Sequence, residues 1–147
     1  MLEVFKYVVA LSTTLFAGAS IYINLVEHPS RLGLETRIAA TQWAPSYQRA
    51  TWMQAPLALV GFATGVAAWL LDAGRLWLVA ALLIGAVVPF TFLVIMPTNR
   101  ALLAPGRDLS SEETRDLLAH WGRLHGVRSV LSLVSSLLFM VLLAHAA

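Results

Sequence analysis

Cysteine is absent from this sequence. Its absence excludes disulfides, thiolate nucleophiles, iron–sulfur clusters and cysteine-ligated zinc. Charge is also scarce, because Asp, Glu, Lys and Arg make up 12% of the residues, against roughly 25% in soluble domains. The hydrophobic share is 59%, so there is too little charge to coat a surface that faces water. We therefore expect most of the surface to contact membrane lipid.

Lysine is nearly absent as well, since Lys6 is the single one, and the net charge is only +2. No basic run of the kind that binds nucleic acid occurs, so we expect no nucleic-acid partner. The length of 147 residues allows one domain, residues 1–147. Whether copies of that domain form a homo-oligomer stays open.

Stretches without a charged residue recur four times, and each has the roughly 20 apolar residues that a membrane helix needs. The apolar runs are continuous rather than alternating, which disfavours strands. The sequence therefore predicts an all-α fold, a membrane-embedded four-helix up-down-up-down bundle. The predicted spans cover about residues 7–28, 50–71, 76–98 and 119–145.

The connections between the spans differ in length. Asp72–Arg75 predicts a tight turn, whereas Pro29–Arg49 and Arg100–His120 are long polar segments that predict loops. In the second of these, Ser110 as N-cap with Glu113 forms a capping box. We therefore expect a short extra helix before the fourth span, which it joins.

The first apolar stretch also fits a signal peptide, with Lys6 as basic start and Ala17-Gly18-Ala19 as cleavage site. It continues into Ile21-Tyr22-Ile23, which favours a membrane span. Eight of the ten basic residues lie at the end with the long segments. The positive-inside rule therefore places both termini outside the cytoplasm, and we expect the plasma membrane of a bacterium.

Polar residues gather where the alternation of spans brings four helix ends together. On the first span Ser20, Asn24, Glu27 and His28 share a face, and on the fourth Trp121, His125, Arg128 and Ser132 do so. Ionisable groups at membrane depth usually face inward and often serve function. Histidine suits a base, and arginine with an amide suits an oxyanion. The candidate catalytic residues are His28, His125, Glu27, Arg128 and Asn99, and the candidate substrate contacts are Asn24, Trp52 and Trp121.

Other interpretations of these residues stay open. Trp52 and Trp121 also fit the aromatic belt of a membrane interface, and Glu27 with Arg128 also fits a structural ion pair. Glu27, His28 and His125 offer the ligand types of a single iron, copper or zinc ion. His28 and His125 as haem ligands are a less favoured alternative, and a site without any cofactor is a further one.

Three segments resemble one known family. The segment Ala17–Pro29, which includes Asn24, resembles the first-helix signature of a family of membrane proteins. This family is called DUF1772, or anthrone oxygenase-like. Met96–Leu102 resembles the end of their third helix, and Trp121–Arg128 resembles the W-x-x-x-H-x-x-R start of their fourth. The resemblance covers nearly the whole chain.

The resemblance implies a small four-helix membrane protein. Named members of that family oxidise anthrones to anthraquinones with dioxygen. It therefore implies an oxidoreductase that acts on an apolar phenolic or ketonic substrate at the polar end of the bundle. The alternative is a non-enzymatic membrane protein that binds a metal, haem, quinone or lipid, or that is a subunit of a larger complex.

Overall fold

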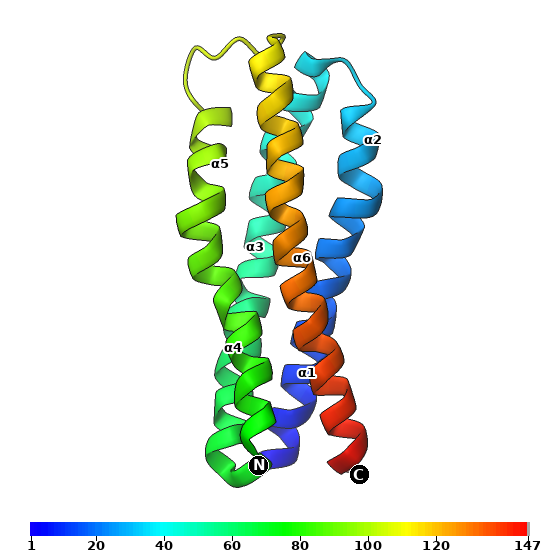
Figure 1. The fold of residues 1–147 in the computed structure, drawn as a ribbon, viewed down its shortest axis with the longest axis vertical. Coiled ribbons are helices and arrows are strands. Elements are labelled where there is room, and N and C mark those ends of the chain that lie inside the picture. The colour runs from blue at the N-terminus through cyan, green and yellow to red at the C-terminus, as the bar shows by residue number, and fades with distance from the viewer. Residues whose placement is uncertain (147) are drawn as a thin grey trace.

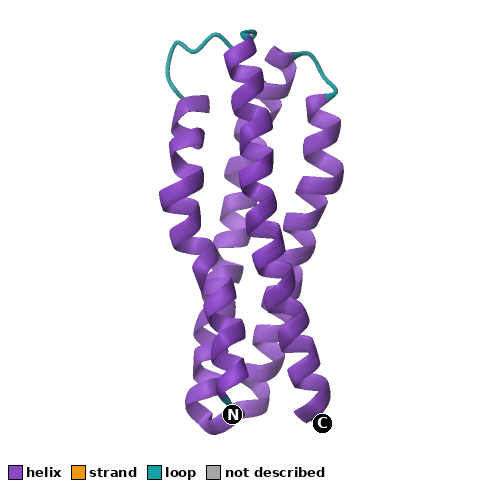
Figure 2. Ribbon diagram, viewed as in Figure 1, coloured by secondary structure: helices purple, strands orange, loops and turns teal. Residues whose placement is uncertain are grey.

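Helices make up all of the regular structure over residues 1–146, the part of the chain that the computed structural model describes (Figures 1 and 2). The segments named η are wide π-helical turns that continue the neighbouring α-helices. This confirms the all-α prediction, while Ala147, the last residue of the expected domain, lies outside the described residues. In chain order the elements are α1 (Leu2–Tyr22), η1 (Ile23–Glu27), α2 (His28–Leu32), α3 (Thr36–Ala68), η2 (Trp69–Ala73), α4 (Arg75–Phe90), η3 (Thr91–Ile95), α5 (Met96–Leu102) and α6 (Glu112–Ala146).

These elements join into four rods that are long and apolar enough to span a membrane, which confirms the predicted four-helix bundle. Both termini and one tight turn lie at one end of the bundle, and the two longer connections lie at the other (Figure 1). We call the end with the two connections the head and the end with the termini the tail. The four rods are Leu2–Leu32, Thr36–Ala73, Arg75–Leu102 and Glu112–His145.

The connections at the head are shorter than predicted. Pro29–Arg49 is helical except around Gly33–Glu35, so the prediction of a long loop there is wrong. Its polar residues belong to helices that extend beyond the apolar spans. At the tail the predicted tight turn is present, and Gly74 adopts a φ of 105°, a conformation that glycine reaches without steric strain.

The predicted extra helix is not separate, because α6 runs without a break from Glu112 through the fourth span. The predicted cap is also displaced by one residue. The Ser111 hydroxyl accepts the N–H of Thr114 at 3.2 Å and so satisfies one free donor of the first turn. The Ser110 hydroxyl instead accepts a hydrogen bond from Arg37 Nε at 3.0 Å, which ties the connection to α3.

The tail half is closely packed, with α1 and α4 each lying against both α3 and α6. At Gly65 an added Cβ would lie 2.9 Å from both the Ala81 Cβ and the Phe139 Cζ atoms. Such small residues let membrane helices approach, and the resulting van der Waals contacts hold them together. The Phe139 ring also packs on Trp77, with ring centroids 5.5 Å apart.

The head half contains two wide helical turns. The wide turns η1 and η3 are each followed two residues later by a proline, Pro29 or Pro97. A proline ring crowds the carbonyl one turn back, and a wider turn gives that carbonyl room. Helix α5 packs against α6 and stands apart from α3 (Figure 1). The head also has a buried apolar core, which includes Trp43, Leu118 and Trp121, and its buried polar side chains lie beside that core.

Candidate active site

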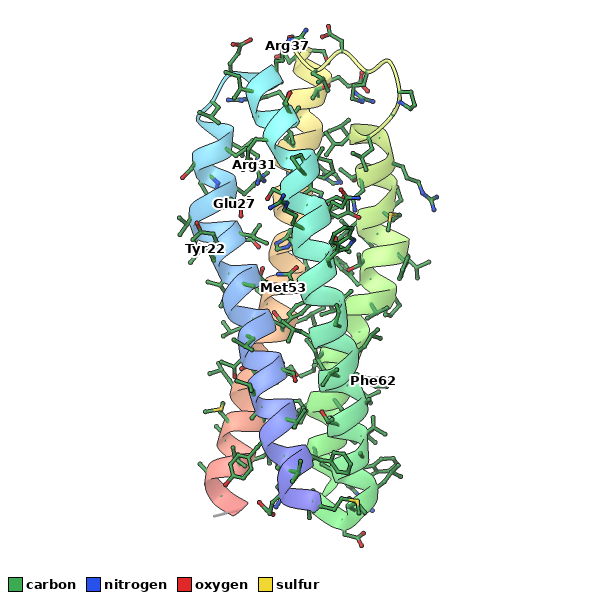
Figure 3. The ribbon with its side chains drawn as sticks, turned by 180° about the vertical axis from the view of Figure 1, so that it is seen from behind. Tyr22, Glu27, Arg31, Arg37, Met53 and Phe62 are labelled. Atoms are coloured by element: carbon green, nitrogen blue, oxygen red, sulfur yellow. The ribbon has the colours of Figure 1, made fainter. Side chains whose placement is uncertain are left out.

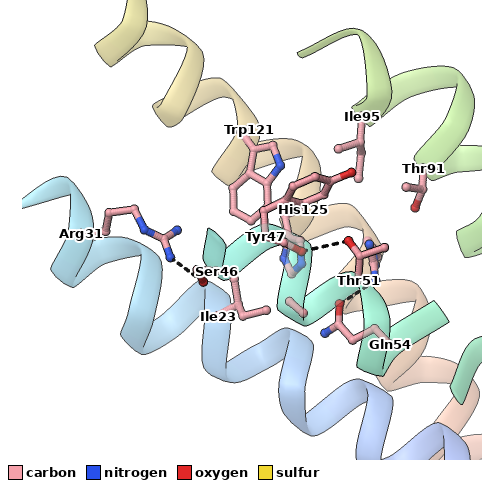
Figure 4. A pocket seen from close by; sticks show the side chains of 12 residues that line it. Ile23, Arg31, Ser46, Tyr47, Thr51, Gln54, Thr91, Ile95, Trp121 and His125 are labelled. Atoms are coloured by element: carbon pink, nitrogen blue, oxygen red, sulfur yellow. Dashed lines mark hydrogen bonds between the residues drawn. The ribbon is translucent and has the colours of Figure 1, made fainter. Parts of the chain in front are cut away.

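A narrow cavity lies between the rods in the head half (Figure 4). Its volume of about 20 Å³ is room for about one water molecule. All four rods contribute to its wall, so the cavity forms only when the bundle is assembled. Its lining residues are Ile23 from η1, Arg31 from α2, Ser46, Tyr47, Ala50, Thr51 and Gln54 from α3, Thr91 and Ile95 from η3, and Trp121, His125 and Arg128 from α6.

His125 is held through one ring nitrogen only. The Asn24 amide nitrogen donates to the Gly122 carbonyl at 3.0 Å, which turns the Asn24 oxygen toward the His125 Nδ1 atom, 2.6 Å away. That oxygen can only accept, so the His125 Nδ1 atom carries the proton. Within residues 1–146 the other nitrogen, Nε2, makes no hydrogen bond, and His125 lines the cavity. In the neutral ring Nε2 is therefore a free proton acceptor.

His28 is held through both ring nitrogens. Arg31 Nη1 donates to the His28 Nδ1 atom at 3.2 Å, so that nitrogen is unprotonated. The His28 Nε2 atom then donates to the Leu118 carbonyl at 3.0 Å. Gly122 permits this approach, because a Cβ there would lie only 2.5 Å from the His28 ring. With no nitrogen left free, His28 is a fixed part of the wall behind the cavity.

Glu27 pairs with Arg31, one helical turn further along the same rod (Figure 3). The carboxylate of Glu27 also accepts a hydrogen bond from Ser46 of α3, and Arg31 Nη2 donates to the same hydroxyl at 3.1 Å. Arg31 Nε donates to Gln42, also of α3. The network joins α2 to α3, and the ion pair between Glu27 and Arg128 that the sequence left open does not form.

Arg128 is a buried cation without a carboxylate partner. Its exposed fraction is 8%, its Nη2 donates to the Gln54 amide oxygen at 2.6 Å, and its guanidinium lies 4.9 Å from the centre of the Phe16 ring. No salt bridge reaches it within residues 1–146, and its Nε is buried without a hydrogen bond. A buried charge is normally paired, so this one is available to an anion in the cavity.

Aromatic rings connect the two histidines. The Trp121 ring stacks on His125, with centroids 4.8 Å apart at 28°, and lies 5.1 Å from the His28 ring. Trp43 meets Trp121 edge-on at 5.7 Å and stacks flat on Tyr47 at 5.1 Å. Trp121 is buried, so it is a wall of the site and not a belt residue. The rings fix the plane in which His125 presents its free nitrogen.

A free imidazole nitrogen and an unpaired guanidinium therefore face one small cavity. The first can take a proton from a bound molecule. The second can stabilise the negative charge that this leaves on an oxygen, and it does so strongly because the surroundings are apolar. The arrangement is suited to forming an enolate or phenolate.

Comparison with protein families matches residues 43–138 to the family described as anthrone oxygenase. The chain belongs to the anthrone oxygenase family. An anthrone oxygenase from Claviceps purpurea is 30% identical over 148 residues, covering 90% of this chain and 84% of that protein. One from Pestalotiopsis fici is 33% identical over 69% of this chain and 82% of its own length. No solved structure matches the chain.

The residues that the sequence predicted for the site lie at different positions relative to the cavity. His125, Arg128 and Trp121 line the cavity. Asn24 orients His125, while His28 and Glu27 lie behind the wall in the contacts described above. Asn99 of α5 is 1% exposed, and its amide has no hydrogen bond within the described residues, but it does not line the cavity. Trp52 is 73% exposed on the outer surface, away from the site.

The predicted metal ligands do not come together as a ligand set. Within residues 1–146 no group of three or more histidine, cysteine, aspartate or glutamate side chains is placed to hold a metal ion. The Glu27 carboxylate is engaged by Arg31 and Ser46, and both nitrogens of His28 are engaged as well. Haem between the two histidines does not fit either, because the Trp121 ring packs against both.

Several residues of the site were missed in the sequence. Arg31, Tyr47 and Ser46 line the cavity, yet all three fall in the segment that was predicted to be a loop. A signal was present, because Trp43, Tyr47, Thr51 and Gln54 follow steps of four, four and three and so share a helix face. Glu27 and Arg31 likewise have the four-residue spacing of a helical ion pair.

Proposed function

We propose that this protein is a membrane oxygenase that oxidises an apolar fused-ring phenol or ketone of the anthrone type to a quinone with dioxygen. One observation carries the proposal: the free Nε2 atom of His125 and the unpaired guanidinium of Arg128 face the same cavity. The relatives are anthrone oxygenases, and their activity supplies the substrate class.

The first step is a proton transfer. His125 Nε2 removes a proton from the methylene carbon that lies opposite the ketone of the substrate. The negative charge spreads through the rings to the ketone oxygen, where Arg128 stabilises it. The Asn24 oxygen, 2.6 Å from the His125 Nδ1 atom, stabilises the positive imidazolium ring that forms.

The second step adds dioxygen to the resulting carbanion. A carbon–oxygen bond forms at the former methylene, and the terminal oxygen takes a proton to give a hydroperoxide. Loss of water breaks the oxygen–oxygen bond and leaves a ketone, so one oxygen atom enters the quinone and the other leaves as water. The substrate supplies all four electrons that dioxygen receives, so the balance needs no further reductant. The cavity, with room for about one water molecule, is of a size to admit dioxygen.

The test is to purify the protein in lipid nanodiscs, add a hydroxylated anthrone, and follow dioxygen consumption together with quinone absorbance. The change His125→Gln should lower the rate by about 10²–10⁴-fold, the usual contribution of a general base. The matched control is His120→Gln, because His120 is an exposed histidine on the same helix. Its rate should equal that of the unaltered protein.

Two results would contradict the proposal. Full activity of the His125→Gln protein would show that His125 is not the base. Tight binding of the anthrone without dioxygen consumption would instead support the non-enzymatic alternative, a membrane protein that binds such a molecule without converting it.

A further inference from the structure

A second cavity adjoins the site on the side that faces lipid. It has a volume of about 100 Å³, five times that of the narrow cavity, and the two share Tyr47, Thr51, Thr91 and Arg128 in their walls. We call this second cavity the lipid-side chamber. It lies between α3 on one side and α4 with η3 on the other.

The wall of the lipid-side chamber is apolar apart from its inner end. Ala55, Ala58, Val87, Val88, Phe92 and Met96 form most of it. The hydroxyls of Thr51 and Thr91 donate to carbonyls of their own helices, at 2.9 and 2.7 Å, and so offer the chamber little polarity. Arg128 is the charged residue among the described residues that line it.

The mouth of the lipid-side chamber opens toward the bilayer. Phe92 is 63% exposed on η3, and Ala55 is exposed across from it on α3. Both lie within rods that are apolar enough to span the membrane, so lipid tails and not water surround the opening. A molecule can therefore reach Arg128 from the bilayer without passing through the head connections.

We propose that the lipid-side chamber binds the ring system of a flat, apolar aromatic molecule that carries an acidic oxygen at one edge, and that the molecule is taken from the bilayer. The apolar walls match the rings, and the unpaired charge of Arg128 matches the oxygen as an anion. The narrow cavity beyond Arg128 is too small for the rings, so they lie in the lipid-side chamber and extend through its open mouth. Only the conversion of the bound molecule rests on the proposed function; its binding does not.

The test uses alizarin, a stable hydroxyanthraquinone whose colour changes when its phenol ionises. Alizarin is titrated into nanodiscs that contain the protein, and empty nanodiscs correct for partition into lipid. The ionised colour should appear with the unaltered protein and should be lost with Arg128→Met.

The variant Ala55→Trp should weaken alizarin binding by at least about tenfold, because an indole side chain fills the mouth. Ala63→Trp is the matched control, since Ala63 is exposed on the same helix away from the chamber, and its binding should not change. Val88→Phe blocks the opposite wall and serves if Ala55→Trp fails to fold. Unaltered binding in both blocked variants, or no colour change with the unaltered protein, would overturn the proposal.

The same variants separate this proposal from the proposed function. If Ala55→Trp weakens alizarin binding but no anthrone is ever oxidised, binding in the lipid-side chamber is supported and the oxygenase function is contradicted. If Ala55→Trp and Val88→Phe both oxidise anthrone at the normal rate, the oxygenase function is supported and binding in the chamber is contradicted.

Discussion

Lys6 in the tail and Arg128 in the head are both buried, but these two cations are held in different ways. In the tail, Lys6 lies 2.8 Å from the carboxylate of Glu3 and 5.9 Å from the centre of the Trp77 ring. In the head, Arg128 has an amide and the Phe16 ring but no carboxylate within the described part of the chain. A charge that only supported the fold would be paired, as Lys6 is, so the unpaired charge of Arg128 indicates a place for an anionic ligand.

The two halves of the bundle also differ in the space between their helices. In the tail, an added Cβ at Gly65 would contact Ala81 and Phe139 at 2.9 Å, which leaves no room. In the head, the narrow cavity and the lipid-side chamber lie side by side around Arg128. The close approach at Gly65 therefore supports helix association, whereas the head holds two cavities beside its own apolar core. Substitutions at Gly65 should change stability, and substitutions at the residues that line the cavities should change activity.

The largest effect is expected at Arg128. Arg128→Met should lower the rate of anthrone oxidation by about 10²–10³-fold, the range found when one oxyanion donor is removed. Thermal melting should change little, because the loss of the Gln54 hydrogen bond is offset by relief of an unpaired buried charge. Oxidation rate and melting in nanodiscs give the two readouts.

The matched variant in the tail is Lys6→Met. It should leave the oxidation rate unchanged and lower stability by about 1 kcal/mol, mostly through loss of the cation–π contact with Trp77. If Lys6→Met abolished activity, or if Arg128→Met prevented folding, the contrast between the two cations would be lost.

The next largest effect is expected at Gly65. Gly65→Leu should lower the free energy of unfolding by about 1–3 kcal/mol, because the new side chain must displace Ala81 or Phe139. Thermal melting in detergent measures the change. Gly18→Leu is the control, since a Cβ there would meet no atom within 4 Å. Equal melting of the two variants would show that the tail is not closely packed.

The four spans could be predicted from the sequence because lipid excludes charge and leaves every backbone group to be paired within a helix. The limits of the helices could not. Polarity was taken as a sign of a loop between Pro29 and Arg49, but these helices continue beyond the apolar core, where polar residues are compatible with either structure. Proline at the start of a helical turn is tolerated, so Pro29 did not end the first rod.

The sequence predicted that polar residues gather in the head, because the antiparallel alternation of the spans brings those helix ends together. The roles of the two histidines did not, because sequence carries no record of which nitrogen is engaged. His28 and His125 were equal candidates for the base, and only the contacts of His28 with Arg31 and Leu118 distinguish them. The partner of Glu27 depends likewise on whether the helix continues past Pro29 to Arg31.

A smaller effect is expected at Gly122. Gly122→Ala places a methyl group 2.5 Å from the His28 ring, so the hydrogen bond from His28 to Leu118 must lengthen. We expect a loss of about 0.5–1.5 kcal/mol in stability. The oxidation rate should also fall, because the His28 ring supports Trp121, which in turn packs on His125.

Two further variants identify the cause. Gly126→Ala should be nearly neutral, since the nearest atom to its Cβ is the Asn24 Nδ2 atom at 3.7 Å. The double variant Gly122→Ala with His28→Ala should be no slower than His28→Ala alone, because without the ring the added methyl group meets no clash. A double variant clearly slower than His28→Ala would show that Gly122 acts through something other than His28.

The smallest effect is expected at Trp52. The sequence allowed Trp52 and Trp121 the same two interpretations, but Trp52 is 73% exposed and Trp121 is buried against His125. Trp52→Phe should leave the rate unaltered and shift stability by no more than about 0.5 kcal/mol, as is usual for surface changes. Trp121→Phe makes the same chemical change inside the site, where a smaller ring supports His125 less well, so the rate should fall. If Trp52→Phe lowered the oxidation rate and Trp121→Phe did not, Trp52 would belong to the site. The substrate would then bind on the outer surface of α3.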